Sequence, residues 1–339
     1  MESTRTEVPV AFGLTDPIVR VDSGYRRMYE IPVGDNIFSA PSVTSITDAT
    51  LRSIGVEKWK ESLITKKLYS MTGNVLGPDD VNEVMSAPDR EFKESGEIGT
   101  QLHEIIHGLI NETDVRIPDQ LLPSVKGFMK WRESYMKDWT LAGSEVGVHW
   151  IEPYLGQDGA AFGYAGTVDA IWKNGSRILV CDWKTSSGIY PSHMMQVAAY
   201  AHALQNMLSA KELSEPEFFV NGTKHKVPFK VEALVVLFDN HKDSNRQKVF
   251  TEKIKLYDVD VGYWYDAFKS CYDLSQYTKK KITATRYEGG AKRWYNNWNV
   301  IQGDVTCTTI LLRLLGASTS GHLNRKQRQT GGGLIQQGR

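Results

Sequence analysis

The sequence predicts an α/β fold in which a central mixed β-sheet is flanked by helices. The apolar residues of 97–111 follow helical spacing, and three strand-like segments come after them. The turn signal Asn174-Gly175 joins the last two of these strands as a hairpin. A further helix and a strongly apolar strand complete the order αβββαβ between residues 97 and 238, which is typical of a mixed sheet covered by helices.

The first part of the chain is expected to contribute little to that sheet. Residues 1–40 are punctuated by Pro and Gly, and we expect an irregular leader there. Residues 41–46 then read as a strand end or a helix start. Expected helices run over 51–71, 78–95, 97–111 and 119–138.

The sheet itself is expected to begin where Val146, Val148 and Trp150 alternate with polar residues, as in a half-buried strand. The other expected strands are 163–172, 177–183, 229–238 and 247–257, with helices over 191–209 and 260–276. From Gly316 the composition is rich in Gly, Gln, Ser and Arg, so we expect no core there. The predicted organisation is a leader at 1–40, one domain at 41–285 and an extension at 286–339.

Composition excludes several classes of protein. The 339 residues are 41% hydrophobic and can bury a sizeable core. Forty basic residues balance forty acidic ones, which argues against a protein that coats DNA, but leaves open a nuclease with a local basic groove. The three cysteines lie far apart, so a disulfide framework, a Cys-based zinc site and a four-cysteine iron–sulfur cluster are not expected.

The amino-terminal segment has neither a signal-peptide core nor an Arg-rich presequence, and no run of 18 apolar residues occurs. We therefore expect an intracellular protein, in the cytoplasm of a bacterial or phage-infected cell or in an organellar matrix, without a membrane span.

The candidate active site consists of three acids and one lysine on the predicted strands. Asp169 lies in the first strand of the hairpin, and Asp182 in the second at similar height. Lys184 follows Asp182 by two residues, so both point to the same face of the strand. Glu145, at the start of the preceding strand, can add a third carboxylate.

A solvated strand edge is the ordinary interpretation of any single acid-x-Lys triplet. Here the triplet follows Ile178-Leu179-Val180-Cys181, which is typical of a buried strand, so it emerges from the core. Three clustered acids would repel one another without a cation, and Mg²⁺ or Mn²⁺ prefers such oxygen ligands. Such an ion would activate water and neutralise charge on a scissile phosphate, while Lys184 would orient or deprotonate that water.

Gln196 and Tyr200 are four residues apart on one face of the following helix. They could hydrogen-bond to the site or stack on a nucleobase, although such a pair also occurs in any partly buried amphipathic helix.

Asp169, the Asp182-x-Lys184 triplet and the Gln196-x-x-x-Tyr200 helix, in this order, resemble the PD-(D/E)XK nuclease superfamily. The similarity is greatest to its RecB-like exonuclease branch, which includes phage-type and mitochondrial genome maintenance exonucleases, and it covers roughly residues 40–275. The iron–sulfur members of the branch are a poorer match because the four cysteines are absent.

This resemblance implies a restriction-endonuclease-like core and a role for each matching residue. His103 would be a metal ligand and Glu145 the acid of the first core strand. Asp169 and Asp182 would be the main metal ligands, with one or two Mg²⁺ or Mn²⁺ ions, and Lys184 the catalytic lysine. The residues expected to contact DNA are Ser42, Thr44, Thr185, Ser186, Gln196 and Tyr200.

The activity implied is exonuclease action on single-stranded DNA or DNA ends, in replication, recombination or repair. A helicase, recombinase or annealing protein is a conceivable partner.

Two other functions stay open. His103-Glu104-Ile105-Ile106-His107 spells H-E-x-x-H, the helical signature of zinc metalloproteases, with Glu104 as general base. An inactive DNA-binding relative of the nucleases is the second alternative. Late in the chain, basic and aromatic residues interleave between Lys279 and Trp298; they suit single-stranded DNA and equally a solvated helix end with a partly buried aromatic cluster.

Overall fold

A computed structural model describes residues 3–24, 26–51, 54–152, 163–211, 218–220, 223–225, 227–244 and 248–277. The chain divides into two units, Met1–Lys281 and Ile282–Arg339. The described residues all belong to the first unit. The expected extension at 286–339 and the basic-aromatic segment between Lys279 and Trp298 therefore lie outside them.

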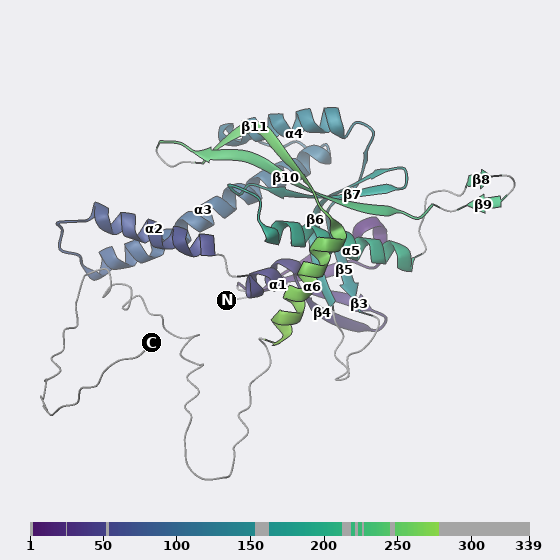
Figure 1. The fold of residues 1–339 in the computed structure, drawn as a ribbon, viewed down its shortest axis with the longest axis horizontal. Helices are drawn as coiled ribbons and strands as arrows, with labels where there is room; N and C mark the ends of the chain where they lie inside the picture. The colour runs from purple at the N-terminus through teal and green to yellow at the C-terminus, as the bar shows by residue number, and fades with distance from the viewer. Residues whose placement is uncertain are drawn as a thin grey trace, which may run out of the picture. The chain divides into compact units, whose positions relative to one another are not determined.

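A five-stranded mixed sheet forms the centre of the first unit (Figure 1). Its strands are β5 (Thr140–Ile151), β6 (Gly163–Asn174), β7 (Arg177–Lys184), β10 (Lys230–Lys242) and β11 (Lys248–Asp258). The spatial order is β11-β10-β7-β6-β5. Only the β7–β10 pair within this sheet is parallel. The expected mixed α/β architecture is thus confirmed, and the five expected strands are all present.

The two faces of this sheet are covered by different helices. On one side lie α5 (Pro191–Ala210) and α6 (Val261–Tyr277), which share a core with Val168 and Val180 of the sheet. On the other side, α4 (Leu122–Tyr135) and the end of α3 (Pro78–Ile110) enclose Trp172 and Trp183. β7 is buried on both faces, which explains its almost continuous apolar sequence.

The irregular leader expected at 1–40 is wrong. β1 (Thr4–Val8), β2 (Ile18–Asp22), β3 (Arg27–Val33) and β4 (Asn36–Pro41) form a four-stranded antiparallel sheet in chain order. Gly24 and Gly34 have φ angles of 77° and 58°, a region that glycine adopts readily. The glycines that suggested irregular structure are therefore the turns of two hairpins.

This N-terminal sheet packs on β5 and β6. The N–H of Gly147 donates to the carbonyl of Pro9 at 2.7 Å, and Ser42 forms a single parallel bridge with Ala165. A Cβ atom at Gly147 would come within 2.8 Å of Ile18 Cδ1. The missing side chain of Gly147 thus allows the two sheets to approach.

Along the chain, three helices separate the N-terminal sheet from the five-stranded sheet before α4. They are α1 (Val43–Thr50), α2 (Ile54–Ser70) and the 33-residue helix α3. The expected helices at 78–95 and 97–111 are one continuous helix. Pro88 lies buried inside it and does not end it. A two-stranded pair, β8 (Phe218–Val220) and β9 (Thr223–His225), was not expected. None of the described helices is long and apolar enough to cross a membrane.

Candidate functional site

The registers of β5, β6 and β7 bring the three expected acids to the same height. Ser144 and Val146 pair with Ala170 and Val168, so Glu145 lies opposite Asp169. Ala170 pairs with Cys181, and the next step of that register places Asp169 opposite Asp182. The hairpin closed by Asn174 and Arg177 sets this alignment, as the sequence predicted.

His103 of α3 completes a group of potential metal ligands. One ligand atom from each of His103, Glu145 and Asp169 lies within 4.8 Å of the others. His103 Nδ1 is 3.4 Å from Asp169 Oδ1. The expected ligands His103 and Asp169 therefore meet, and Glu145, expected as a catalytic acid, joins them as a third potential ligand.

Asp169 is held as a carboxylate. Burial acts to raise its pKa, but the charges of His103 and Lys184 and the Trp183 N–H together leave the pKa below its usual value. The Trp183 N–H donates to Asp169 Oδ2 at 2.6 Å. This bond orients the carboxylate and leaves Oδ1 directed toward His103.

Asp182 lies beside this group, almost completely buried at 2% exposure. Lys184 Nζ is 2.6 Å from Asp182 Oδ2, so the two side chains form a buried ion pair. Burial raises the pKa of Asp182 to about 6, against the opposing charge of Lys184. Asp182 is therefore a buried carboxylate whose charged form is stabilised mainly by the ammonium of Lys184.

Lys184 is oriented by a chain of hydrogen bonds that runs to α5. Its Nζ donates to Gln196 Oε1 at 3.0 Å, and Gln196 Nε2 donates to the Tyr200 hydroxyl at 3.0 Å. Tyr200 is only 4% exposed, so it cannot stack on a nucleobase, one of the two roles that the sequence left open. A Cβ at Gly166 would lie 2.2 Å from Tyr200 Cε1, so the glycine makes room for this ring.

Glu145 has two unusual properties. Its φ angle is 51°, although it is a non-glycine residue inside a strand, and such backbone conformations cost about 1–3 kcal/mol and persist mainly at functional sites. Burial, with the nearby charge of Asp169, raises the pKa of Glu145 to about 7. Arg20 of β2 is close enough that its charge acts to lower this pKa.

The H-E-x-x-H helix does not bring its two histidines to one ligand group. His107 is not a member of the group around His103; its Nδ1 lies 2.8 Å from Ser144 Oγ. Glu104 is exposed on α3. The described side chains therefore favour a site that uses His103 without His107.

The expected DNA-contacting hydroxyls have varied surroundings. Ser42 is 1% exposed and caps α1, accepting the Ser45 N–H at 3.0 Å, so it supports the helix and is not accessible to a strand. Thr44 is partly exposed beside it. Thr185 and Ser186 are partly exposed after β7, and Asn240 Nδ2 holds their carbonyls at 3.1 Å each.

Arg20 and Arg27 are charged residues near the site that were missed in the sequence. Arg20 acts on Glu145, and Arg27 is close enough to Tyr200 to interact with its hydroxyl. Both belong to the segment expected to be irregular. The alternation of Arg20-Val21-Asp22 and Arg27-Met28-Tyr29 was the available signal for strands.

The donor set could hold a metal ion. It consists of one imidazole and two carboxylates, with the Asp182–Lys184 pair beside them. Cys181, which is buried next to Asp182, is not part of the ligand group.

Comparisons with known proteins are sparse. No protein-family model matches the chain, and no curated protein matches it. Among solved structures, the chain is similar to one described as "Crystal structure of SSO0001", with 15% sequence identity and a TM-score of 0.24. The match covers 64% of this chain and 86% of that chain. A TM-score this low carries no argument about the protein.

Proposed function

We propose that the protein is a Mg²⁺- or Mn²⁺-dependent DNA nuclease of the PD-(D/E)XK type, from its RecB-like exonuclease branch. The observation that carries this proposal is the meeting of acids from three adjacent strands with His103 and Lys184. Exonuclease action on single-stranded DNA or DNA ends follows from the resemblance and belongs to the same proposal.

The arrangement of elements supports the proposed core. α3, α4, β5, β6, β7, α5 and β10 follow one another along the chain, with β7 and β10 parallel in the centre of the sheet. The hairpin carries Asp169 on one strand and Asp182 with Lys184 on the other.

In this proposal, His103, Glu145 and Asp169 hold the cation, with Asp182 beside them. When bound, the ion lowers the pKa of a water molecule and neutralises negative charge on the scissile phosphate. The fixed carboxylates and the Trp183 N–H bond keep the ligand atoms in place before DNA arrives.

Lys184 supplies the proton chemistry that the protein itself contributes. Its Nζ can donate to the attacking water or to a phosphate oxygen, while Gln196 prevents the side chain from folding away. The water oxygen forms a bond to phosphorus and loses a proton to solvent, while the bond to the leaving sugar oxygen breaks and that oxygen takes up a proton from solvent. The buried Asp182, 2.6 Å from the Lys184 Nζ, helps to aim this side chain at the site.

The test is cleavage of an end-labelled single-stranded oligonucleotide in EDTA, Mg²⁺ or Mn²⁺. Lys184→Ala should lower the rate by roughly a thousandfold or more, because one preorganised donor at the reacting phosphate contributes on that scale. Lys230→Ala is the matched control, since Lys230 also pairs with an acid, Glu232 at 3.0 Å, on an exposed part of β10.

Metal-dependent shortening that disappears only in Lys184→Ala supports the proposal, and the ladder separates end-directed from internal cutting. If single-stranded and duplex DNA and RNA all stay intact in every lane, the nuclease proposal is wrong, and an inactive DNA-binding relative of the nucleases is favoured instead. Hydrolysis of peptides with zinc would point to the metalloprotease.

A further inference from the structure

One face of the N-terminal sheet changes from apolar to charged where it reaches the site. Ile18, Arg20 and Asp22 alternate along β2, and Arg27, Tyr29 and Ile31 along β3. The register pairs Arg20 with Tyr29 and Asp22 with Arg27, so these six residues share one face. Ile18, Tyr29 and Ile31 are at most 1% exposed. The charged residues therefore lie at the end of a face that packs against the core.

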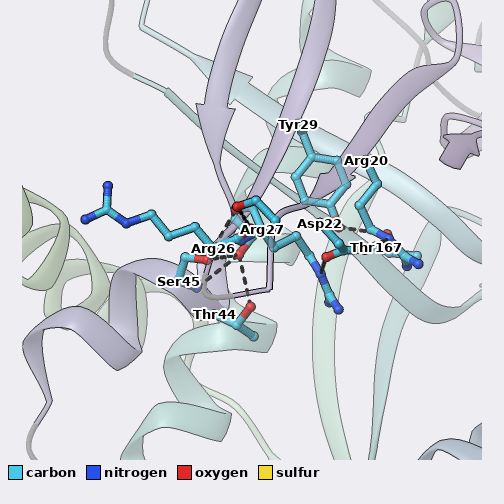
Figure 2. Close-up of polar contacts among 10 residues, drawn as sticks. Arg20, Asp22, Arg26, Arg27, Tyr29, Thr44, Ser45 and Thr167 are labelled. Carbon is cyan, nitrogen blue, oxygen red and sulfur yellow. Dashed lines mark hydrogen bonds and ion pairs between the residues drawn. The ribbon is translucent and has the colours of Figure 1, made fainter. Parts of the chain in front are cut away.

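Asp22 holds the two arginines together. Its carboxylate oxygens lie 2.9 Å from Arg20 Nε and 2.8 Å from Arg27 Nε (Figure 2). Figure 2 shows the two side chains approaching Asp22 from different sides, while Arg26 extends away from it. The Arg27 Nε donates a hydrogen bond to Asp22, whereas the Arg20 Nε only lies within ion-pair distance of it. No contact among the described residues occupies the Nη groups of either arginine.

The carboxylate carries one negative charge against two positive ones. The side chains of Arg20 and Arg27 are 28% and 44% exposed, so their Nη groups can be reached from solvent. Guanidinium groups with free, pre-oriented donors match the geometry of phosphate oxygens.

The arginines are close to the proposed reaction centre. The Tyr29 hydroxyl, next to Arg20 across the strands, lies 2.9 Å from Thr167 Oγ1 on β6, as Figure 2 shows. Thr167 is two residues from Asp169, which is roughly 7 Å along a strand. The position of β3 is secured at its other side, where the Ser42 N–H donates to the Arg27 carbonyl at 3.0 Å.

We propose that Arg20 and Arg27, oriented by Asp22, form a phosphate clamp that binds the nucleic-acid strand beside the scissile phosphodiester. This inference rests on the proposed function and assigns its substrate-binding surface to the N-terminal sheet. The clamp supplies the positive charge that a cluster of three acids needs before it can accept an anionic strand.

The experiment measures binding of a fluorescent single-stranded oligonucleotide to the full chain in EDTA, where no cleavage occurs. Arg20→Ala and Arg27→Ala should each weaken binding roughly tenfold, since each removes a charge-assisted contact. Each should also reduce the slope of log affinity against log salt concentration by roughly 0.7 per phosphate lost.

Arg5→Ala is the matched control. Arg5 also pairs with an acid, donating to Glu30 at 2.9 Å, and belongs to the same sheet. Arg5 lies opposite Val21, on the other face of the sheet from Asp22. The Arg5→Ala substitution therefore removes the same charge from the other face. Unchanged binding by Arg5→Ala, with losses in the other two, supports the clamp. Equal losses in all three, or none in any, would overturn it.

A chemical cycle distinguishes direct contact from a structural role. Neutral methylphosphonate replaces one phosphate at a time in the oligonucleotide. At one methylphosphonate position, the loss of affinity should equal the loss caused by Arg27→Ala. Combining that modified oligonucleotide with the Arg27→Ala protein should then weaken binding no further than either change alone. Additive losses at every position would contradict a direct contact. Arg27→Lys, which keeps the charge, should show the same coupling with a smaller loss and replaces Arg27→Ala if that variant does not fold.

Two further measurements distinguish the strand clamp from a simple phosphate site and from the nuclease proposal. Inorganic phosphate should compete only weakly; Arg27-dependent phosphate binding as tight as that of the strand would overturn a strand clamp. Arg27-dependent DNA binding by a protein that cuts nothing in Mg²⁺ or Mn²⁺ would overturn the nuclease but keep the clamp. Normal cleavage and normal binding by both arginine variants would overturn the clamp alone.

Discussion

The acid cluster on the central sheet and the arginine pair on the N-terminal sheet are opposite kinds of charged site. In the acid cluster, three acids from adjacent strands lie together with His103, and the most buried of them, Asp182, pairs with Lys184 at 2.6 Å. In the arginine pair, Asp22 compensates only part of the positive charge, and the side chains stay accessible to solvent.

The difference indicates what each site can bind. A partly buried cluster of carboxylates favours a cation, because a cation offsets the repulsion between the acids. An exposed pair of oriented donors favours an anion that remains partly hydrated, such as a phosphate on a strand. Changes in the acid cluster should therefore affect turnover and metal response, whereas changes in the arginine pair should affect affinity for DNA.

The largest effect that separates the two sites is expected from His103→Ala, with His107→Ala as its matched control on the same helix. Loss of His103, a proposed ligand, should weaken the response to Mn²⁺ by roughly a hundredfold or more, because even residues that only orient metal ligands contribute about 10–100-fold. The His103→Ala variant should bind DNA in EDTA as tightly as the unchanged protein does. Arg27→Ala, in contrast, should weaken this binding. Titration of cleavage rate with Mn²⁺ gives the measurement. Equally severe losses from both histidine variants would instead indicate a zinc site that uses the whole H-E-x-x-H segment.

A smaller effect is expected at Gly166, which links the acid cluster to α5. Gly166→Ala would drive a methyl group into the Tyr200 ring, where only 2.2 Å is available. We expect a loss of about 1–3 kcal/mol in the free energy of unfolding, together with slower turnover as Gln196 and Lys184 are displaced. Urea denaturation measures the first effect and single-turnover cleavage the second. Gly175→Ala is the control, because its Cβ would meet no atom within 4 Å and only backbone strain at φ 56° applies. A fully active, fully stable Gly166→Ala would show that Tyr200 has room to move.

The smallest effect tests the strained backbone of Glu145. Glu145→Gly and Glu145→Ala both remove the carboxylate, and both should abolish activity. Glycine accepts a φ of 51° and alanine does not, so the glycine variant should be the more stable by about 1 kcal/mol. Thermal unfolding of the two variants gives the comparison. An alanine variant as stable as the glycine one would mean that the strand relaxes once the acid is gone.

The central sheet was predictable from sequence because its elements are long and its periods are clear. The buried run before Asp182 and the Asn174-Gly175 turn together implied which acids would face one another. The register then followed from the turn, without knowledge of the packing.

The N-terminal sheet was not predictable by the same reasoning. Its strands are short and partly exposed, and the turns at Gly24 and Gly34 resemble the punctuation of a loop. Arg20 and Arg27 become significant only because the fold brings their charges near Glu145 and Tyr200, which are far away in sequence. Similarly, the sequence indicated two separate helices over 78–95 and 97–111, whereas α3 is one continuous helix with Pro88 buried inside it.

The contact between Pro9 and Gly147 has a consequence for solubility. β5 is the outermost strand of the five-stranded sheet and is 12 residues long, which leaves a row of backbone groups that could recruit a foreign strand. The Pro9 carbonyl occupies one of these groups, and the N-terminal sheet lies against the strand around it. The sheet that carries the arginines thus also shields part of this edge from pairing with a foreign strand.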